Sequence, residues 1–414
     1  MNLNPRILLK LNQVRTPNDA AQIWQEHWRE LEGWQLVLSE NNVAERRFRW
    51  PARLDLQGKG FLRSAFAHDS LWFTNSEILA AISQGRKVDI LVDYSIGFDL
   101  NTATYLLATV EGRKPEIVQV FQGVLRGLAG AKFNWDVLPY LDERFEDVMA
   151  ERDRDAIFRT ILSTERFAAC DHERFASTGD IFLPEGEAGP IAKSHELLAM
   201  HHQVLMQGKA ERLRGQHRTI LAIVLKIAAL ERLYPGPQHA ARKLARVIEF
   251  MHNRLHCLMF LLIWAAGEYF RLGGAFRPLR KLSRNTGSEL DKAASNIAWD
   301  FRHVLSRQSM SANIGHEGSF HVPYLLTFDR DIAALYDGFP QRSCLVGPDN
   351  EGPYFIAERS LDLYLFGHWP GLKESIGWVF LEDIRAERLK MHETASVDLV
   401  GLLAELRSDF GFVG

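Results

Sequence analysis

The stretch that decides the fold is residues 87–110, KVDILVDYSIGFDLNTATYLLATV. Its first part, which ends at Asp99, is short, rich in β-branched residues and followed by a turn, as is typical of a buried strand. From residue 101 onward, polar residues precede apolar residues at helical spacing, which predicts a helix. A strand, an acidic residue and a helix in this order indicate an α/β site at the carboxyl end of a strand.

A second stretch repeats this order near residue 325. Residues 321–327 (HVPYLLT) predict a short apolar strand, and residues 329–336 predict the helix that follows it. Between the two stretches, helical periodicity dominates, and we expect helices over 216–233, 239–271 and 290–307. The sequence therefore predicts an α/β fold, a parallel-sheet core with a large, mostly α-helical insertion.

Length and composition are those of a globular protein. The chain has 414 residues, of which 46% are hydrophobic and 24% are charged, and this excludes a disordered chain, a collagen-like chain and a disulfide scaffold. We expect a mixed region over 1–86, a discontinuous core over 87–150 and 290–345, a basic helical insertion over 151–289 and an extension over 346–414.

Cysteine usage and hydropathy bear on the compartment. Cys170, Cys257 and Cys344 lie far apart and form no CxxC pair, which suits a reducing environment. The N-terminus lacks the pattern of a signal peptide, and the longest uncharged run, residues 255–267, is shorter than the roughly 20 residues that span a bilayer. These features predict a cytoplasmic protein that does not act at a membrane.

Acidic residues stand where predicted strands end or helices begin. Magnesium and manganese are hard cations that prefer carboxylate oxygens and water, and a pair of them positions a water and stabilises the leaving oxygen of a phosphodiester. Each acid also has an ordinary structural role, as a helix cap, an ion-pair partner or a surface residue. The candidates are Asp99, Glu143, Asp300, Asp329 and Asp331.

At these residues the chain resembles the PIN-like nuclease superfamily. Phe98-Asp99-Leu100-Asn101 looks like the Asp-Thr-Asn motif of the first strand, with Leu100 in place of a small hydroxyl residue. Trp299-Asp300 looks like the third acid, inside a helix, and residues 325–331 (LLTFDRD) look like the late strand that ends in Thr-x-Asp-x-Asp. Glu143 stands for the second acid, a place that Glu146 or Asp136 could also take.

The resemblance implies a metal-dependent ribonuclease or DNase with a parallel-sheet core, and of the two substrates we favour RNA. A water activated by Mg²⁺ or Mn²⁺ would attack the phosphodiester, and a regulatory protein partner or a homo-oligomer would restrain the activity, as in a toxin or phage-defence effector. The implied metal ligands are Asp99, Glu143, Asp300 and Asp329. Asp331 would be a ligand or its partner, Asn101 would orient the water or the first carboxylate, and Thr327 would bond a carboxylate or phosphate.

A basic segment lies within the helical insertion. Residues 209–284 contain fifteen Lys or Arg against four Asp or Glu, so this segment carries a net charge of +11. Such a charge indicates a surface that contacts phosphates without reading sequence, or simply a helical surface kept soluble by arginine. The candidate nucleic-acid-binding residues are Arg212, Arg214, Arg218, Arg242, Lys243, Arg246, Arg280 and Lys281.

Two other functions remain open at this point. The first is a non-catalytic nucleic-acid-binding or scaffold subunit with a degenerate PIN-like core. The second is a metal-independent ribonuclease of the HEPN type, because Arg246 and His252 have its Arg-x5-His spacing. Convergence of the acids would favour the metal-dependent enzyme, and resistance to EDTA would favour the HEPN type.

Overall fold

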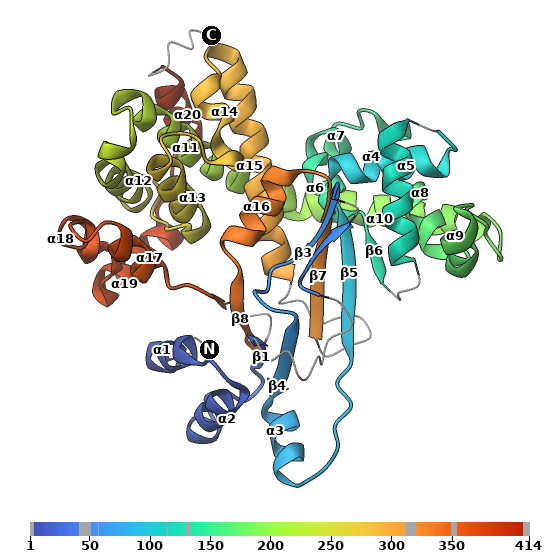
Figure 1. Ribbon diagram of the computed structural model, residues 1–414, viewed down its shortest axis with the longest axis horizontal. Helices are drawn as coiled ribbons and strands as arrows, with labels where there is room; N and C mark the ends of the chain where they lie inside the picture. Colours follow the sequence, from blue (N-terminus) through green and yellow to red (C-terminus); the bar gives the residue numbers. More distant parts are fainter. Residues whose placement is uncertain are drawn as a thin grey trace. The chain divides into compact units, whose positions relative to one another are not determined.

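The computed structural model describes residues 4–40, 51–56, 58–113, 115–129, 133–310, 320–348 and 354–408. The chain divides into two compact units (Figure 1). Unit 1 consists of Met1–Gln207, Leu305–Tyr336 and Pro340–Glu358, and unit 2 of Gly208–Val304, Asp337–Phe339 and Arg359–Gly414. The described part of unit 1 is mixed α/β, and that of unit 2 is helical.

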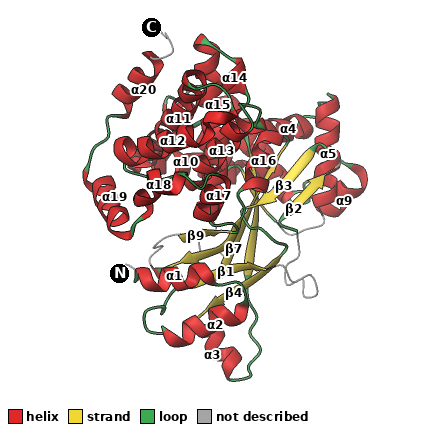
Figure 2. Ribbon diagram, turned by 60° about the vertical axis from the view of Figure 1, so that its left-hand side comes forward, coloured by secondary structure: helices red, strands yellow, loops and turns green. Residues whose placement is uncertain are grey.

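The strands of unit 1 form two sheets, drawn in yellow in Figure 2. In the five-stranded sheet the order is β2-β3-β7-β5-β6, where β5 pairs in parallel with both β7 and β6, while β3 is antiparallel to its neighbours. The other sheet, β4-β1-β8-β9, is antiparallel. The strands are β1 (Gln35–Glu40), β2 (Arg53–Leu56), β3 (Gly60–Ser64), β4 (Ser70–Asn75), β5 (Val92–Phe98), β6 (Asn134–Asp136), β7 (Phe320–Thr327), β8 (Gln341–Val346) and β9 (Tyr354–Ala357).

The helices of unit 1 begin at conventional signals. The side chains of Thr16, Asn75 and Asp171 each accept a hydrogen bond from the first turn of the helix that follows. The helices are α1 (Pro5–Gln13), α2 (Pro17–Glu26), α3 (Ser76–Ser83), α4 (Leu100–Val110), α5 (Glu116–Leu128), α6 (Leu138–Glu143), α7 (Phe145–Met149), α8 (Arg154–Ala169), α9 (His172–Thr178), α10 (Ala188–Val204) and α16 (Arg330–Gly338), which ends in unit 2.

The two faces of the five-stranded sheet differ in polarity. On one face, Phe98 stacks on Trp135 with ring centroids 5.8 Å apart, and Phe121 of α5 and Phe167 of α8 pack against these rings. Side chains alternate between faces along a strand, so Ser95 and Gly97 point to the opposite side. This alternation gives unit 1 one apolar face, covered by helices, and one polar face.

Unit 2 is built around α11, whose apolar stripe was predicted correctly: Ile220, Ile223, Val224, Ile227 and Leu230 are all buried. A π-helical turn (Leu205–Lys209) precedes α11. The helices that follow are α11 (Ala210–Leu233), α12 (Ala240–Leu255), α13 (Phe260–Arg271), α14 (Lys281–Arg284), α15 (Gly287–Met310), whose last six residues belong to unit 1, α17 (Leu361–His368), α18 (Leu372–Ile376), α19 (Glu382–Thr394) and α20 (Leu399–Ser408).

The single helix predicted over 239–271 is wrong. It is two helices, because His256 adopts a left-handed conformation (φ 50°) that ends α12. A residue in this conformation directs the chain away from the helix axis, and apolar periodicity does not register it. Among the described helices, none is long and apolar enough to cross a membrane.

Several other boundaries differ from those predicted. The strand expected from residue 87 begins at Val92. The described residues of 1–86 contribute β1 to β4 to the two sheets of unit 1, while residues 151–207 also belong to unit 1 rather than to a separate helical insertion. The end of the core expected at residue 345 falls inside β8, one residue before that strand ends.

Candidate functional site at the carboxyl edge of the central sheet

Strands β5 and β7 bring two of the predicted acids to one edge of the sheet. They pair in parallel from Val92 opposite Phe320 to Phe98 opposite Leu326, so their carboxyl ends coincide. Asp99 directly follows β5, and Asp329 follows β7 after one intervening residue. The predicted order of strand, acid and helix is confirmed at both places, since α4 begins at Leu100 and α16 at Arg330.

Asp99 is buried, with 3% of its surface exposed, and is held by hydroxyl and amide groups. Its Oδ1 accepts hydrogen bonds from the Thr102 backbone N (2.7 Å) and from Thr102 Oγ1 (2.8 Å), so it caps α4. Its Oδ2 accepts a hydrogen bond from Thr327 Oγ1 at 2.6 Å. The cap expected from the sequence is confirmed, and so is the expected bond between Thr327 and a carboxylate.

Thr327 links Asp99 to the second acid. Its Oγ1 also accepts a hydrogen bond from the backbone N of Asp329 at 2.9 Å. Asp329 Oδ1 in turn accepts one from the backbone N of Asp331 at 2.6 Å, which caps α16. Asp329 is half-buried and Asp331 is buried. The carboxyl edge therefore carries Asp99, Asp329 and Asp331, fixed to one another through Thr327 and the main chain.

Aromatic rings pack behind this edge. Phe328 contacts Tyr105 of α4 and Phe121 of α5, with ring centroids 5.7 Å apart in both pairs. Burial raises the pKa of the Tyr105 hydroxyl, and the negative charge of Asp99 raises it further. This packing leaves the loop after β7 little freedom, so the acids are carried by a rigid support.

The other predicted site residues lie in different environments. Asn101 is exposed in the first turn of α4. Glu143 is the last residue of α6 and is half-buried in unit 1. Asp300 belongs to α15 within unit 2, whereas the edge just described consists of unit 1 residues alone.

Within the part of the chain that the structure describes, no group of three or more His, Cys, Asp or Glu side chains is arranged to hold a metal ion. Magnesium, however, usually keeps several waters and binds through one or two carboxylates together with substrate phosphates, rather than in a cage made of protein. The carboxylate oxygens of Asp99, Asp329 and Asp331 are of the type that Mg²⁺ and Mn²⁺ prefer. The donor set at the edge thus fits such an ion in chemistry.

Polar residues that the sequence analysis did not select occupy the polar face of the same sheet. The guanidinium of Arg307, at the end of α15, is buried and donates a hydrogen bond to Asp136 Oδ2 at 2.8 Å. Ser95 Oγ lies 3.0 Å from His321 Nε2, and His321 Nδ1 lies 3.0 Å from the carbonyl oxygen of Met310. That carbonyl can only accept, so Nδ1 donates and Nε2 accepts from Ser95.

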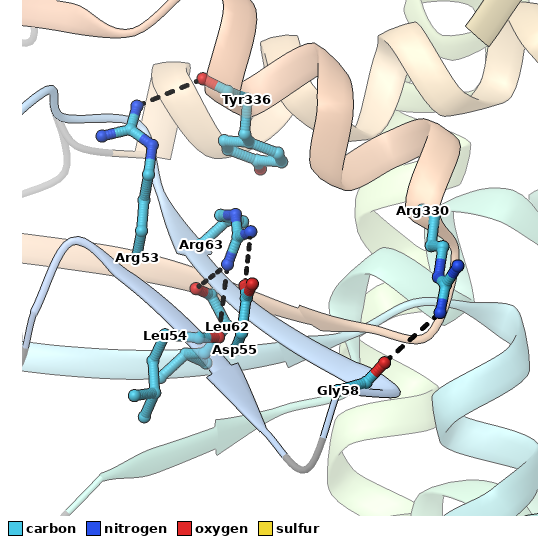
Figure 3. A network of polar contacts seen from close by, with 8 residues as sticks. All are labelled: Arg53, Leu54, Asp55, Gly58, Leu62, Arg63, Arg330 and Tyr336. Atoms are coloured by element: carbon cyan, nitrogen blue, oxygen red, sulfur yellow. Dashed lines mark hydrogen bonds and ion pairs between the residues drawn. The ribbon is translucent and has the colours of Figure 1, made fainter. Parts of the chain in front are cut away.

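Figure 3 shows the part of the same face that lies over β2 and β3. Arg63 is buried and donates to the carbonyl oxygens of Leu54 and Leu62 and to Asp55 Oδ1, the last at 2.7 Å. Arg53 donates to the carbonyl oxygen of Tyr336 in α16 at 3.3 Å. The signal for this face in the sequence is the alternation of polar or small residues with large apolar residues along DYSIGFD, residues 93–99.

The predicted phosphate-binding residues all lie in unit 2, on α11, on α12 and at the start of α14. Lys243 does not lie on the surface: it is fully buried, and its Nζ donates to Glu231 Oε2 at 2.6 Å and to the carbonyl oxygen of Gly236. Its predicted contact with phosphate is therefore wrong. The exposed members of the set are Arg212, Arg242, Arg246 and Lys281, and the half-buried ones are Arg214, Arg218 and Arg280.

His252, the general base of the HEPN-type alternative, is half-buried on α12. Its Nδ1 lies 3.2 Å from Arg388 Nη1, and its ring contacts Trp378 edge-on. Burial lowers the pKa of His252, and the positive charge of Arg388 lowers it further. A neutral imidazole is therefore favoured at this position.

We compared the chain with protein-family models, with curated proteins and with solved structures, and none of the three comparisons finds a match.

Proposed function

We propose that this protein is a metal-dependent nuclease that cleaves RNA at the carboxyl edge formed by β5 and β7. One observation supports the proposal above all: Thr327 joins Asp99 and Asp329 at the ends of two adjacent parallel strands. In open α/β sheets, ligands bind outside the carboxyl ends of the strands.

The residues at this edge would have different roles in the reaction. Asp99 and Asp329 would hold Mg²⁺ or Mn²⁺, with Asp331 as their partner, and the ion would supply Lewis-acid stabilisation and an activated water. The hydroxyl of Thr327 fixes the orientation of the Asp99 carboxylate, and the cap on α4 prevents that carboxylate from turning away. Preorganised groups of this kind need no rearrangement when charge develops in the reaction.

The test is cleavage of labelled single-stranded RNA, single-stranded DNA and duplex DNA in Mn²⁺, in Mg²⁺ or in EDTA. Asp99→Asn and Asp329→Asn keep a capping oxygen but remove the charge, so each should fold. We expect both variants to lose more than about 100-fold in rate, because even the outer partners of metal ligands contribute 10–100-fold. Asp171→Asn is the matched control, since Asp171 caps α9 in the same unit.

The results separate this proposal from its alternatives. Metal-dependent cutting that survives in Asp99→Asn would contradict the proposed site. Cutting that persists in EDTA and depends on His252 would support the HEPN-type enzyme instead.

A non-catalytic nucleic-acid-binding role is the second candidate. It is favoured by the capping bonds that occupy Asp99 and by the lack of a three-ligand group among the described residues. In that case neither metal would produce cutting, while binding that weakens with salt would remain.

A further inference from the structure

A groove in unit 2 combines cationic and aromatic side chains. It has a volume of about 490 Å³ and lies between α12 and the segment that joins α17 to α18. One wall carries Arg242 and Arg246, one helical turn apart on α12, and the other carries His368 and Trp369. Small residues, Ala241, Ala245 and Gly371, leave the space between the walls open.

Trp369 is a rigid platform in this groove. It packs against the backbone of α13, where a Cβ added to Gly267 would lie 3.2 Å from Trp369 Cη2. The ring of Tyr364 meets it edge-on at 6.0 Å, and the Tyr364 hydroxyl is fixed by a hydrogen bond to Glu268 Oε1. Trp369 is half-buried, and its indole N–H donates no hydrogen bond to any residue in the described part of the chain.

The two arginines are available for exchange with an anion. The guanidinium of Arg242 lies over the ring of Tyr234 at 4.2 Å, which restrains the side chain without neutralising its charge. Arg246 pairs with Glu249 at 3.7 Å, and the Arg246 side chain is 59% exposed. Exposed pairs of this kind contribute little, so a phosphate can replace the carboxylate as the partner of Arg246.

We infer that this groove binds single-stranded nucleic acid, with one base stacked on Trp369 and neighbouring phosphates held by Arg242 and Arg246. Stacking on an aromatic side chain requires an unstacked base, which a duplex does not offer. The volume of the groove suits a nucleotide-sized group. The inference rests on the proposed function only in naming the substrate of the nuclease, which would be single-stranded.

Binding is measured by fluorescence anisotropy in EDTA, so that no cleavage takes place. The probes are labelled single-stranded RNA, single-stranded DNA of the same sequence and duplex DNA, and an acidic peptide serves as competitor. We expect Trp369→Ala to raise the Kd for single strands by about tenfold, because the stacking of one base contributes roughly that factor to the affinity. Trp369→Phe should retain most of the affinity, and Trp28→Ala, which removes an exposed tryptophan of unit 1, should bind like wild type.

The arginines are tested through salt dependence. Replacing both Arg242 and Arg246 with Ala should lower the slope of log K against log salt by about 1.4, or about 0.7 for each phosphate contact on a single strand. Arg385→Ala, an exposed arginine on α19, is the control. Circular dichroism of each variant checks that the helices of unit 2 remain folded.

The inference would be overturned by unchanged affinity in Trp369→Ala, by duplex binding as tight as single-strand binding, or by an acidic peptide that displaces the strands. A difference between the RNA and DNA probes identifies which nucleic acid is the ligand. Trp369-dependent binding without metal-dependent cutting would reject the proposed nuclease and keep the groove. Cutting that is indifferent to Trp369 would reject the groove and keep the nuclease.

Discussion

Gly97 lies beneath the buried guanidinium of Arg307, and this contact leaves no room for a side chain. A Cβ at residue 97 would lie 2.6 Å from Arg307 Cζ and 2.8 Å from both of its Nη atoms. Gly97→Ala would push the guanidinium away from Asp136, its ion-pair partner at 2.8 Å. We expect the free energy of unfolding to fall by about 2 to 4 kcal/mol in urea denaturation, since disturbing a buried ion pair is costly.

The matched control for this substitution is Gly127→Ala. Gly127 lies within α5, and a Cβ there would meet no atom within 4 Å. Alanine in a helix should leave stability unchanged or raise it by up to about 1 kcal/mol. Equal effects at the two glycines would show that Arg307 moves aside without cost.

His321 should make the folded state sensitive to acid. Burial lowers the pKa of His321 below 6.5, and the hydrogen bond to the Met310 backbone partly opposes this shift. The charge of Arg307 lowers the pKa further, against smaller opposing effects of Asp136 and Asp93. The unfolded chain therefore takes up a proton at a higher pH than the folded one. The contribution of neutral His321 to the free energy of unfolding should be fully present above about pH 6.5. It should be lost as the pH falls from there through the lower pKa of the folded state.

The measurement is the free energy of unfolding of His321→Gln and wild type between neutral and mildly acidic pH. The variant should lose less stability on acidification, because it has no buried imidazole to protonate. His392→Gln removes an exposed histidine and should retain the wild-type pH profile. A wild-type profile in His321→Gln would show that another group governs the acid sensitivity.

Among the helices and strands, the sequence predicted those that are signalled by a local pattern of polar and apolar residues. The strand–acid–helix order around Asp99 and Asp329 was readable because polarity and spacing change within a few residues. The break at His256 was not, because it depends on one backbone conformation inside an apolar run. The groove beside Trp369 depends on contacts between α12 and residues more than 100 positions away, for which the sequence has no local signal.

The junction between α11 and α12 depends on a buried lysine. Lys243 on α12 and Glu231 on α11 form a buried ion pair, and Lys243 also bonds the carbonyl oxygen of Gly236 in the turn between the helices. Lys243→Met would leave the Glu231 carboxylate nearly buried without its partner. We expect a loss of about 3 to 5 kcal/mol in the free energy of unfolding, measured by denaturant titration.

Two further variants make this prediction specific. Adding Glu231→Gln to Lys243→Met should recover part of the lost stability, because the unpaired charge is removed. Arg246→Met, on an exposed position of the same helix, should change stability by less than about 0.5 kcal/mol. If Lys243→Met instead weakened nucleic-acid binding while stability stayed constant, Lys243 would have the phosphate-binding role first expected for it.

At the scale of the whole molecule, the proposed chemistry and the proposed binding belong to different units. Asp99, Thr327 and Asp329 lie in unit 1, whereas Arg242 and Trp369 lie in unit 2. A contact made equally in the ground state and the transition state affects KM alone, and one made only in the transition state affects kcat. The two sets of residues should therefore be separable by kinetics.

We expect Trp369→Ala to raise KM for single-stranded RNA by about tenfold with kcat unchanged, since stacking on a remote base is the same before and during cleavage. Asp99→Asn should lower kcat by more than about 100-fold with the Kd measured in EDTA unchanged. Steady-state kinetics and anisotropy on the same RNA supply the four values. If Trp369→Ala lowered kcat as much as kcat/KM, the tryptophan would act in the transition state, and the groove would belong to the catalytic site itself.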